Sequence, residues 1–395
     1  MKITMDTTLY LRDIDIRKDN KHYIVEDLAT QEFFEMPKIC IDALGLMKEN
    51  ITLGEIERTL IKEYPNEEVD IIDFTEQLVD LDLIDTINGV KIERSLKNKT
   101  KLGFEWIPQK LGKVFFNSYT KYLYAILFIS NILIFVWKPS LFPHYTDLFV
   151  FDIMSVNILV FGFLTFLMVI IHEFGHILAI RSFNLPTRLE VGRRLYLIVF
   201  ETDLTLAWKL PSKKRNILYL AGVCFDTVSL FIALMVNLFI PIESEIIIGI
   251  VGLIIFDTVV RIIYQCCIYM KTDFYFLFEN LSGTYNIMEN GIHSIKNLFL
   301  KRKSTNKELF AGEEKVVKWY SVFYFIGVAI TLALLVIYYL PQLIYMGISM
   351  LPGYVKPISD PYFWDAVVFT IQILIIVGFL SHSLYKSYRE KVVEN

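Results

Sequence analysis

The stretch IMSVNILVFGFLTFLMVIIHEFGHILAI, residues 153–180, decides the fold of this chain. Its first part, from Ile153 to Ile171, carries no charge and has about the 20 residues that a helix needs to cross a bilayer. The run then enters HEFGH at 172–176, so ionisable side chains stand inside an otherwise apolar helix. Such residues are costly to bury in lipid and mark functional sites by default. The stretch therefore predicts a membrane-spanning helix that carries a functional site.

The HExxH pattern in this helix predicts a metal site. Positions four apart on a helix differ by about 40° of rotation, so His172 and His176 point to one side and can bind one ion. Zinc prefers imidazole and carboxylate ligands, and a catalytic zinc site leaves one position open for water. Glu173 lies beside the histidines, where a general base takes the proton of that water and later delivers it to the leaving amine. The pattern therefore predicts one catalytic zinc ion per chain.

The composition of the whole chain agrees with a membrane protein. Its 395 residues are 54% hydrophobic and 15% aromatic, and the mean hydropathy of +0.46 is too high for an ordinary water-soluble domain. Residues 1–97 hold 22 Asp and Glu against 12 Lys and Arg, although the net charge of the chain is only −4. An acidic head on a basic, apolar body indicates two parts in different solvents and argues against a nucleic-acid partner. We expect no disulfide framework among the four cysteines and no signal peptide at Met1 to Leu11.

Hydropathy predicts six spans, each of about the length that crosses a bilayer. They lie near residues 120–137, 153–180, 217–240, 246–270, 319–340 and 363–385. Lys and Arg concentrate in the loops 182–216 and 271–318, whereas only Lys138 and Lys356 occur in the other three loops. The positive-inside rule therefore predicts that both termini and both basic loops are cytoplasmic, in a bacterial cell membrane.

Residues 1–97 have the periodicity of a small soluble α+β domain. Residues 23–36 read as a strand pair around a polar turn, and three helices are expected after it. The first is expected from Ile39 to Met47 and the third from Val69 to Leu81. The second is expected to begin at a capping box formed by Thr52 and Glu55. Asn88-Gly89 predicts a hairpin wing. The expected fold class is a multi-pass α-helical membrane protein with an N-terminal winged-helix-like α+β domain.

A third zinc ligand is expected at the cytoplasmic end of the second span, because ligand atoms must lie within about 2 Å of one ion. Arg181 marks that end, and Asp273 reaches the same side after the fourth span, so Asp273 is the predicted ligand. The competing carboxylates are Asp257, Asp226 and Glu279. Of these, Asp257 precedes Arg261 by four residues, which favours a structural ion pair on a helix.

The loop between the second and third spans has the alternation of a β-strand. Its alternating apolar residues are Leu189, Val191, Leu195, Leu197 and Val199. Gly192 offers a turn, and a short sheet here would present an edge with which an extended substrate could pair. An equal alternative is a plain cytoplasmic loop whose arginines only fix the topology.

The second to fourth spans resemble the site-2 protease family of intramembrane zinc metalloproteases, most closely its branch of peptide zinc metalloproteases associated with modified peptides. The matching residues are HEFGH at 172–176, GRRLYLIVFETDL at 192–204, LAGVCFD at 220–226 and TDFYF at 272–276. The resemblance implies His172, His176 and Asp273 as zinc ligands and Glu173 as the catalytic base. It also implies that Asp226 stands where the family often has an Asn that helps to hold the substrate. The chain departs from the family at Val223 and Phe274, where Pro and Gly are usual.

The head resembles the PqqD-like recognition element of systems that make ribosomally synthesised, modified peptides. The resemblance lies in the run from Phe33 through TLGEIERTL at 52–60 to FTEQLVDLDLID at 74–85. In that family the third helix and the edge of the strand pair hold a leader peptide as an added strand. The resemblance implies a precursor-binding domain and a transmembrane metalloprotease domain. Between them the basic, amphipathic stretch LGFEWIPQKLGKVFF, from Leu102, predicts an interfacial linker along the membrane surface. Their expected bounds are 1–97, 98–118 and 119–395, with a zinc core at 153–285.

Together these inferences predict a membrane-embedded zinc endopeptidase that removes the leader of a ribosomally made precursor peptide, as in bacteriocin biosynthesis. Its expected partners are the precursor peptide, the lipid bilayer and a peptide exporter. Three alternatives stay open. In the first, the head only packs against the rest of the chain or regulates it. In the second, the enzyme cuts a membrane-anchored regulator. In the third, the chain is a non-enzymatic exporter or immunity protein.

Overall fold

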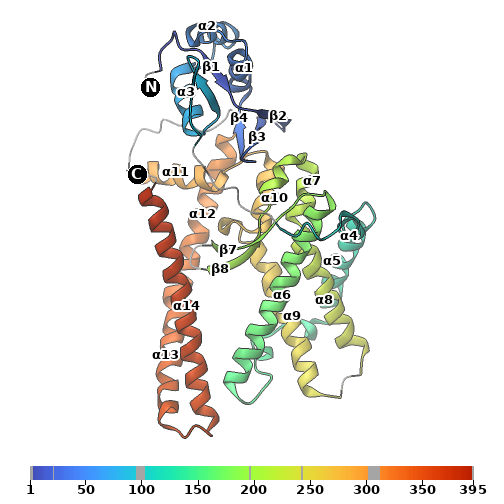
Figure 1. Cartoon of the computed structure of the whole chain (residues 1–395). Helices are drawn as coiled ribbons and strands as arrows, with labels where there is room; N and C mark the ends of the chain where they lie inside the picture. The colour runs from blue at the N-terminus through green and yellow to red at the C-terminus, as the bar shows by residue number, and fades with distance from the viewer. Residues whose placement is uncertain are drawn as a thin grey trace. The chain divides into compact units, whose positions relative to one another are not determined.

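The computed structural model describes residues 3–20, 22–94, 103–194, 197–241, 243–300 and 312–393 (Figure 1). The chain divides into two compact units. Unit 1 comprises Met1–Leu102 and Thr205–Arg215, and unit 2 comprises Gly103–Leu204 and Asn216–Asn395. Several residues used above lie outside the described parts, namely 95–102, Leu195 and residues 301–311 of the loop 271–318.

Unit 1 contains two small antiparallel sheets and three helices (Figure 1). One sheet has the order β2 (Ile14–Asp19), β3 (His22–Asp27), β4 (Phe33–Met36), and the other has the order β1 (Leu9–Leu11), β5 (Ile84–Ile87), β6 (Val90–Lys91). The helices are α1 (Lys38–Met47), α2 (Leu53–Glu63) and α3 (Ile71–Asp80). The predicted strand pair, helices and hairpin are confirmed, whereas β1 and β2 were not predicted.

Local side-chain chemistry explains where these elements begin and turn. The Glu55 amide donates to the Thr52 hydroxyl and the Thr52 amide donates to the Glu55 carboxylate, so the predicted capping box starts α2. Asn88 and Gly89 have φ values of 50° and 77°, the left-handed conformation that a two-residue hairpin turn needs. The apolar faces then meet in one core that includes Val25, Leu44, Met47, Ile56, Leu60 and Leu78.

A segment from far along the sequence, Thr205–Arg215, also belongs to unit 1. Its last residue, Arg215, is 1% exposed and pairs with Asp19 at 2.5 Å. The Lys209 ammonium pairs with the Glu26 carboxylate at 2.9 Å. Both acidic partners lie on strands β2 and β3, so charge pairs hold this segment to the sheet of unit 1.

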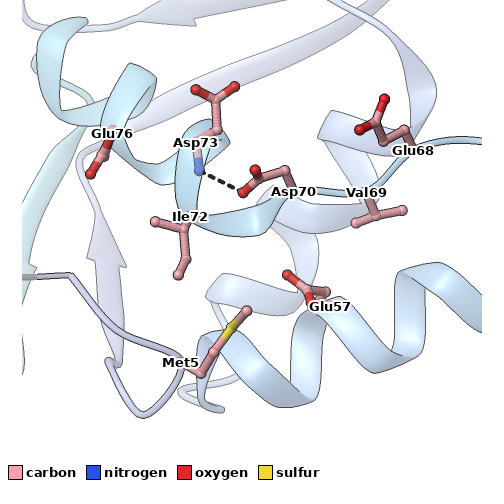
Figure 2. A pocket seen from close by; sticks show the side chains of 8 residues that line it. All are labelled: Met5, Glu57, Glu68, Val69, Asp70, Ile72, Asp73 and Glu76. Atoms are coloured by element: carbon pink, nitrogen blue, oxygen red, sulfur yellow. Dashed lines mark hydrogen bonds between the residues drawn. The ribbon is translucent and has the colours of Figure 1, made fainter.

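An acidic hollow of about 560 Å³ lies beside α2 and α3 in unit 1 (Figure 2). It is lined by Met5, Glu57, Glu68, Val69, Asp70, Ile72, Asp73 and Glu76. The Asp70 carboxylate accepts the Asp73 amide at 2.9 Å and so caps α3. The remaining carboxylates of the lining give this side of unit 1 a negative potential, in line with the acidic composition of the head.

Among the described residues, six helices are long and apolar enough to cross a membrane. They are Thr120–Trp137, Met154–Ser182, Ser212–Phe239, Glu245–Gln265, Glu314–Val355 and Pro361–His382. These correspond to α5, α6, α7 with α8, α9, α12 with α13, and most of α14 (Figure 1). Each of the six predicted segments falls on one of these helices, and the chain is mostly helical.

The bounds of the remaining helices complete unit 2. They are α4 (Gln109–Phe115), α7 (Ser212–Tyr219), α8 (Ala221–Phe239), α10 (Asp273–Ser282), α11 (Ile287–Leu300), α12 (Glu314–Leu334), α13 (Leu340–Met350) and α14 (Pro361–Val393), where α7 begins in the segment of unit 1. The fifth apolar stretch is longer than the predicted 319–340 because a π-helical turn, Leu335–Tyr339, joins α12 to α13. This wider turn accommodates Pro341, which has no N–H to donate to the preceding turn.

Two glycines, Gly175 and Gly112, allow helices of unit 2 to pack closely. A Cβ at Gly175 of α6 would lie 2.6 Å from the Ala221 carbonyl oxygen of α8, so only glycine permits this approach. A Cβ at Gly112 of α4 would lie 2.5 Å from the Leu178 oxygen of α6. The basic stretch that was expected to lie along the membrane surface therefore also packs against the end of α6.

Strands β7 (Leu189–Arg194) and β8 (Leu197–Thr202) form an antiparallel pair, which confirms the strand-like alternation. The expected turn at Gly192 is wrong, because Gly192 lies inside β7 opposite Val199. A Cβ at Gly192 would meet the carboxylate at the flexible end of the Glu201 side chain, so the glycine leaves room for this carboxylate beside β7.

Candidate metal centre

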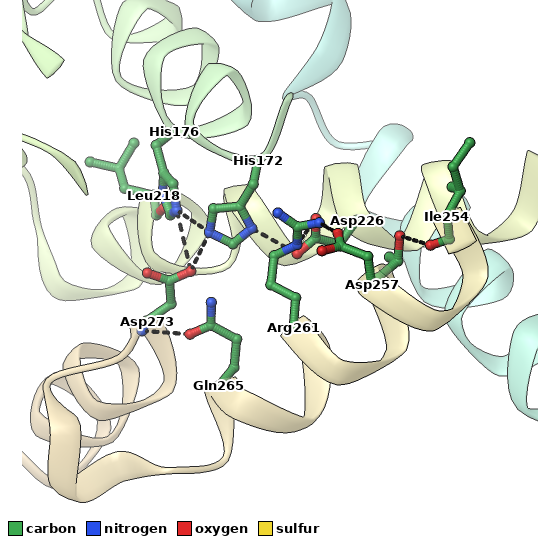
Figure 3. Close-up of polar contacts among 10 residues, drawn as sticks. His172, His176, Leu218, Asp226, Ile254, Asp257, Arg261, Gln265 and Asp273 are labelled. Atoms are coloured by element: carbon green, nitrogen blue, oxygen red, sulfur yellow. Dashed lines mark hydrogen bonds and ion pairs between the residues drawn. The ribbon is translucent and has the colours of Figure 1, made fainter. Parts of the chain in front are cut away.

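Three side-chain atoms from two distant parts of the chain converge near the C-terminal end of α6 (Figure 3). The sequence predicts that this end faces the cytoplasm. The Nε2 atoms of His172 and His176 lie 3.3 Å apart. Asp273 Oδ2 lies 3.1 Å from the first nitrogen and 3.2 Å from the second. All three residues are buried. The structure thus brings together the two histidines and the aspartate that the sequence analysis selected as ligands.

The spacing of these atoms fits a tetrahedral zinc ion. Ligand atoms at 2.0–2.1 Å from such an ion lie about 3.3–3.4 Å from one another. The separations of 3.1, 3.2 and 3.3 Å are close to that value. Two imidazoles with one carboxylate are also a donor set that zinc accepts. The residues present therefore fit the metal that the motif predicts.

Asp273 is held by the short connection between α9 and α10. Its backbone amide donates to Gln265 Oε1 at 3.0 Å, and the Thr272 hydroxyl donates to the Gln265 carbonyl oxygen at 2.8 Å. Burial acts to raise the pKa of Asp273, but the neighbouring imidazoles of His176 and His172 outweigh it and hold this pKa well below its usual range. The connection between α9 and α10 thus fixes the position of Asp273, and the two histidines lower its pKa.

Glu173 is the second carboxylate at the site. One of its carboxylate oxygens lies within 4.8 Å of a ring nitrogen of each histidine. The Thr202 hydroxyl at the end of β8 donates to Glu173 Oε2 at 2.7 Å. This distance from the histidines suits a base that acts on a water beside the metal, and the strand fixes its orientation. Nothing in the sequence pattern pointed to Thr202.

The far nitrogen of each imidazole also has a partner. His176 Nδ1 lies 2.8 Å from the Leu218 carbonyl oxygen, and His172 Nδ1 lies 2.7 Å from Asp226 Oδ2 (Figure 3). Ligand histidines commonly donate their other ring N–H to a carbonyl or carboxylate, which fixes the tautomer. Asp226 therefore contacts a proposed ligand directly. Its role in holding a substrate stays a prediction.

Gly222 leaves room beside the metal-facing atoms. A Cβ at this position of α8 would lie 2.3 Å from His172 Nε2 and 2.5 Å from His176 Nε2. Any other residue would therefore displace both imidazoles. The site needs a glycine here for space and not for backbone conformation, since Gly222 lies within a helix.

The other competing carboxylates have partners of their own. Asp257 pairs with Arg261, which confirms the predicted ion pair. Glu279 Oε1 accepts the Tyr275 hydroxyl at 2.5 Å and the Ile287 amide at 3.0 Å. Burial raises the pKa of Glu279 to about 7, and these hydrogen bonds oppose that rise only in part.

The geometry can support hydrolysis at a buried metal, because it offers three ligand atoms, a separate carboxylate and space beside them. Comparison with known proteins adds no further guide. No protein-family model, curated protein or solved structure matches this chain.

Proposed function

We propose that this chain is a multi-pass membrane protein and a zinc endopeptidase of the site-2 protease kind. The observation that carries the proposal is the position of Asp273 Oδ2, 3.1 and 3.2 Å from two histidine nitrogens that lie 97 or more residues earlier in the sequence. A carboxylate so far along the chain meets an HExxH pair by chance only rarely. Its convergence with them is the arrangement that a three-ligand zinc site requires.

Each side chain at the site then has a distinct task. His172, His176 and Asp273 would hold the metal, which when bound supplies a Lewis acid that lowers the pKa of water. Glu173 takes the proton of the attacking water and delivers it to the leaving amine. Thr202 keeps the Glu173 carboxylate turned toward the site. Such a chain cuts a peptide bond by hydrolysis.

The distribution of side chains supports a membrane location. On α6, the bulky residues Leu159 and Phe163 are 59% and 62% exposed, whereas His172 is 5% exposed. Apolar groups outside and polar groups inside are what a bilayer favours. With six spans and the positive-inside rule, both termini and the metal end of α6 face the cytoplasm in this proposal.

The proposed substrate is a ribosomally synthesised, modified precursor peptide, and unit 1 is its PqqD-like, winged-helix-like binding module. Support comes from the resemblance and from the edge strands of the sheet, β2 and β4, to which an extended leader can add a strand. A tethered module raises the local concentration of the precursor, so weak capture becomes efficient delivery.

The first experiment measures zinc content and proteolysis of the detergent-purified chain. We expect about one zinc per chain, lost in His176→Ala and in Asp273→Ala, and new peptide termini by mass spectrometry when a peptide library is added. Glu173→Gln should keep zinc and lose cleavage. The matched control is Glu245→Gln, an exposed glutamate at the start of α9, which should behave as the natural protein. Full cleavage by Glu173→Gln would end the proposal.

The role of unit 1 is tested separately by capture of the precursor. Asp73 and Glu76 are exposed on α3, and their charge reversal to Lys leaves the core of unit 1 intact. We expect weaker binding of a basic precursor and unchanged cleavage of peptides that need no capture. Unchanged processing of every substrate would favour a protease that cuts a membrane-anchored regulator. Absence of zinc in the natural protein, even after zinc is supplied, would favour an exporter or immunity protein.

A further inference from the structure

A chain of buried charged groups extends from the metal centre into the helices around it (Figure 3). Asp226 Oδ2 lies 2.7 Å from His172 Nδ1, and Asp226 Oδ1 lies 3.4 Å from Arg261 Nε. Arg261 in turn pairs with Asp257. The Thr165 hydroxyl completes the chain by donating to Asp257 Oδ1 at 2.8 Å. Three helices, α6, α8 and α9, thereby share one polar network.

The contact with Asp226 determines how His172 can act. A carboxylate oxygen 2.7 Å from Nδ1 suits the tautomer in which Nδ1 carries the ring proton and donates it to Asp226. The lone pair on Nε2 is then free, and Nε2 is the atom that lies 3.1 Å from Asp273. The same hydrogen bond fixes the rotation of the ring. Asp226 therefore prepares His172 as a ligand without contacting the metal position itself.

Asp226 itself depends on Arg261. Asp226 is 2% exposed, and a carboxylate buried at that depth is costly unless an opposite charge lies near it. Arg261 supplies this charge, and its side chain is only 11% exposed. Asp257 pairs with Nη2 of the same guanidinium, so Arg261 contacts two carboxylates. These two contacts restrain the guanidinium and, through it, Asp226.

We propose that Asp226 is a positioning residue for His172 and that Arg261 acts through Asp226. This inference rests on the proposed zinc site and adds to it a residue pair that the reaction needs. It assigns the Asp257–Arg261 pair a part in the metal centre as well as in helix packing. The network requires both charges, because the carboxylate of Asp226 and the guanidinium of Arg261 depend on each other.

The test is the zinc affinity of the full-length protein in detergent, measured by competition with a chelator. Loss of such a partner of a ligand histidine typically weakens metal binding 10- to 100-fold. We expect a loss in that range for Asp226→Asn and a smaller one, about tenfold, for Arg261→Gln. In the double variant the second change should add little, because Arg261 acts through Asp226. The absorption spectrum of the cobalt-loaded protein should shift in both single variants, which a purely structural role would not cause.

Matched controls separate the possible results. Asp152→Asn, at an exposed aspartate two residues before α6, should keep the natural affinity and spectrum. If Asp226→Asn has a zinc affinity within twofold of the natural protein and an unchanged cobalt spectrum, the inference is overturned while the zinc site stays in place. Multiplying effects in the double variant would overturn the dependence of Arg261 on Asp226. If the natural protein binds no zinc, the proposed function fails together with the inference. Should Asp226→Asn not fold, Arg261→Gln alone decides through the cobalt spectrum.

Discussion

The two units differ in where their large apolar side chains lie. In unit 1, Leu44 and Leu78 are completely buried, whereas acidic side chains such as those of Asp73 and Glu76 are exposed. In unit 2, His172 and Asp226 are buried while Leu159 on the same helix as His172 is 59% exposed. Water drives apolar groups inward, whereas a bilayer leaves them outside and drives polar groups together. The difference teaches that in unit 2 the reactive groups themselves are part of the core.

The largest effect is expected from a substitution that disrupts the buried polar groups of unit 2. Gly222→Ala would place a methyl group 2.3 Å from His172 Nε2, so we expect zinc affinity to fall more than 100-fold and cleavage to vanish. Metal analysis of the purified variant checks this. The matched control is Gly252→Ala on α9, where a Cβ meets nothing within 4 Å and zinc should stay bound. Normal zinc in Gly222→Ala would show that the imidazoles can move aside.

The same substitution should have unequal effects in the two units. Leu44→Ala leaves a cavity in unit 1 and should lower its stability by about 2–5 kcal/mol. Leu159→Ala removes a side chain that is 59% exposed, so we expect a change below about 1 kcal/mol. Hydrogen exchange of the amides in each unit gives the local stability. Equal losses at both positions would mean that Leu159 packs against protein and not against lipid.

The buried carboxyl group of Glu279, outside the six apolar helices, should make the stability of unit 2 depend on pH. Burial raises the pKa of Glu279 to about 7, so the folded state binds this proton more tightly than the unfolded chain. The resulting stability is complete below about pH 4.5 and is lost as the pH rises through about 7. At 1.36 kcal/mol per pKa unit this amounts to roughly 3 kcal/mol.

Hydrogen exchange of α10 and α11 at pH 5 and pH 8 measures this dependence. Glu279→Gln, which is neutral at both values, should remove most of it. Glu243→Gln, in an exposed loop, should leave it unchanged. A pH dependence that persists in Glu279→Gln belongs to another group.

The smallest expected effect concerns the orientation of the base. Thr202→Val removes the hydroxyl that donates to Glu173 Oε2, and we expect kcat to fall about tenfold with zinc content unchanged. Steady-state cleavage assays report kcat and KM separately. The control Thr146→Val changes an exposed threonine and should leave both constants alone. A loss of zinc in Thr202→Val would mean that the hydroxyl supports the ligands and not the base.

Local patterns predicted most of the fold. The apolar run at 120–137 coincides with α5, and the Thr52 capping box and the Asn88-Gly89 turn appear as expected. Each of these depends on neighbours in the sequence, so the sequence carries the whole signal. Strand β1 was missed because it has only three residues and pairs with β5, far along the chain. The interior position of Gly192 was missed for a similar reason, since only the side chain of Glu201 explains it.

The candidate site divides in the same way. His172, Glu173 and His176 follow from one helical repeat, and Asp273 followed from topology and resemblance. Thr202, Gly222 and the contact of Arg261 with Asp226 depend on how separate helices and strands meet. No spacing rule contains that information. The reactive groups are therefore visible in the sequence, whereas the residues that orient them are visible only in the fold.

The segment Thr205–Arg215 has a consequence for genetic dissection of this protein. It starts three residues after Thr202 and ends three residues before Leu218, whose carbonyl oxygen contacts His176. Deleting residues 1–97 removes Asp19 and Glu26, the partners of Arg215 and Lys209 in this segment. Loss of the proposed activity in a truncated chain can then result from displacement of this segment, even if that activity needs no leader. Point substitutions on the surface of α3 avoid this ambiguity, whereas a deletion would confuse recognition with catalysis.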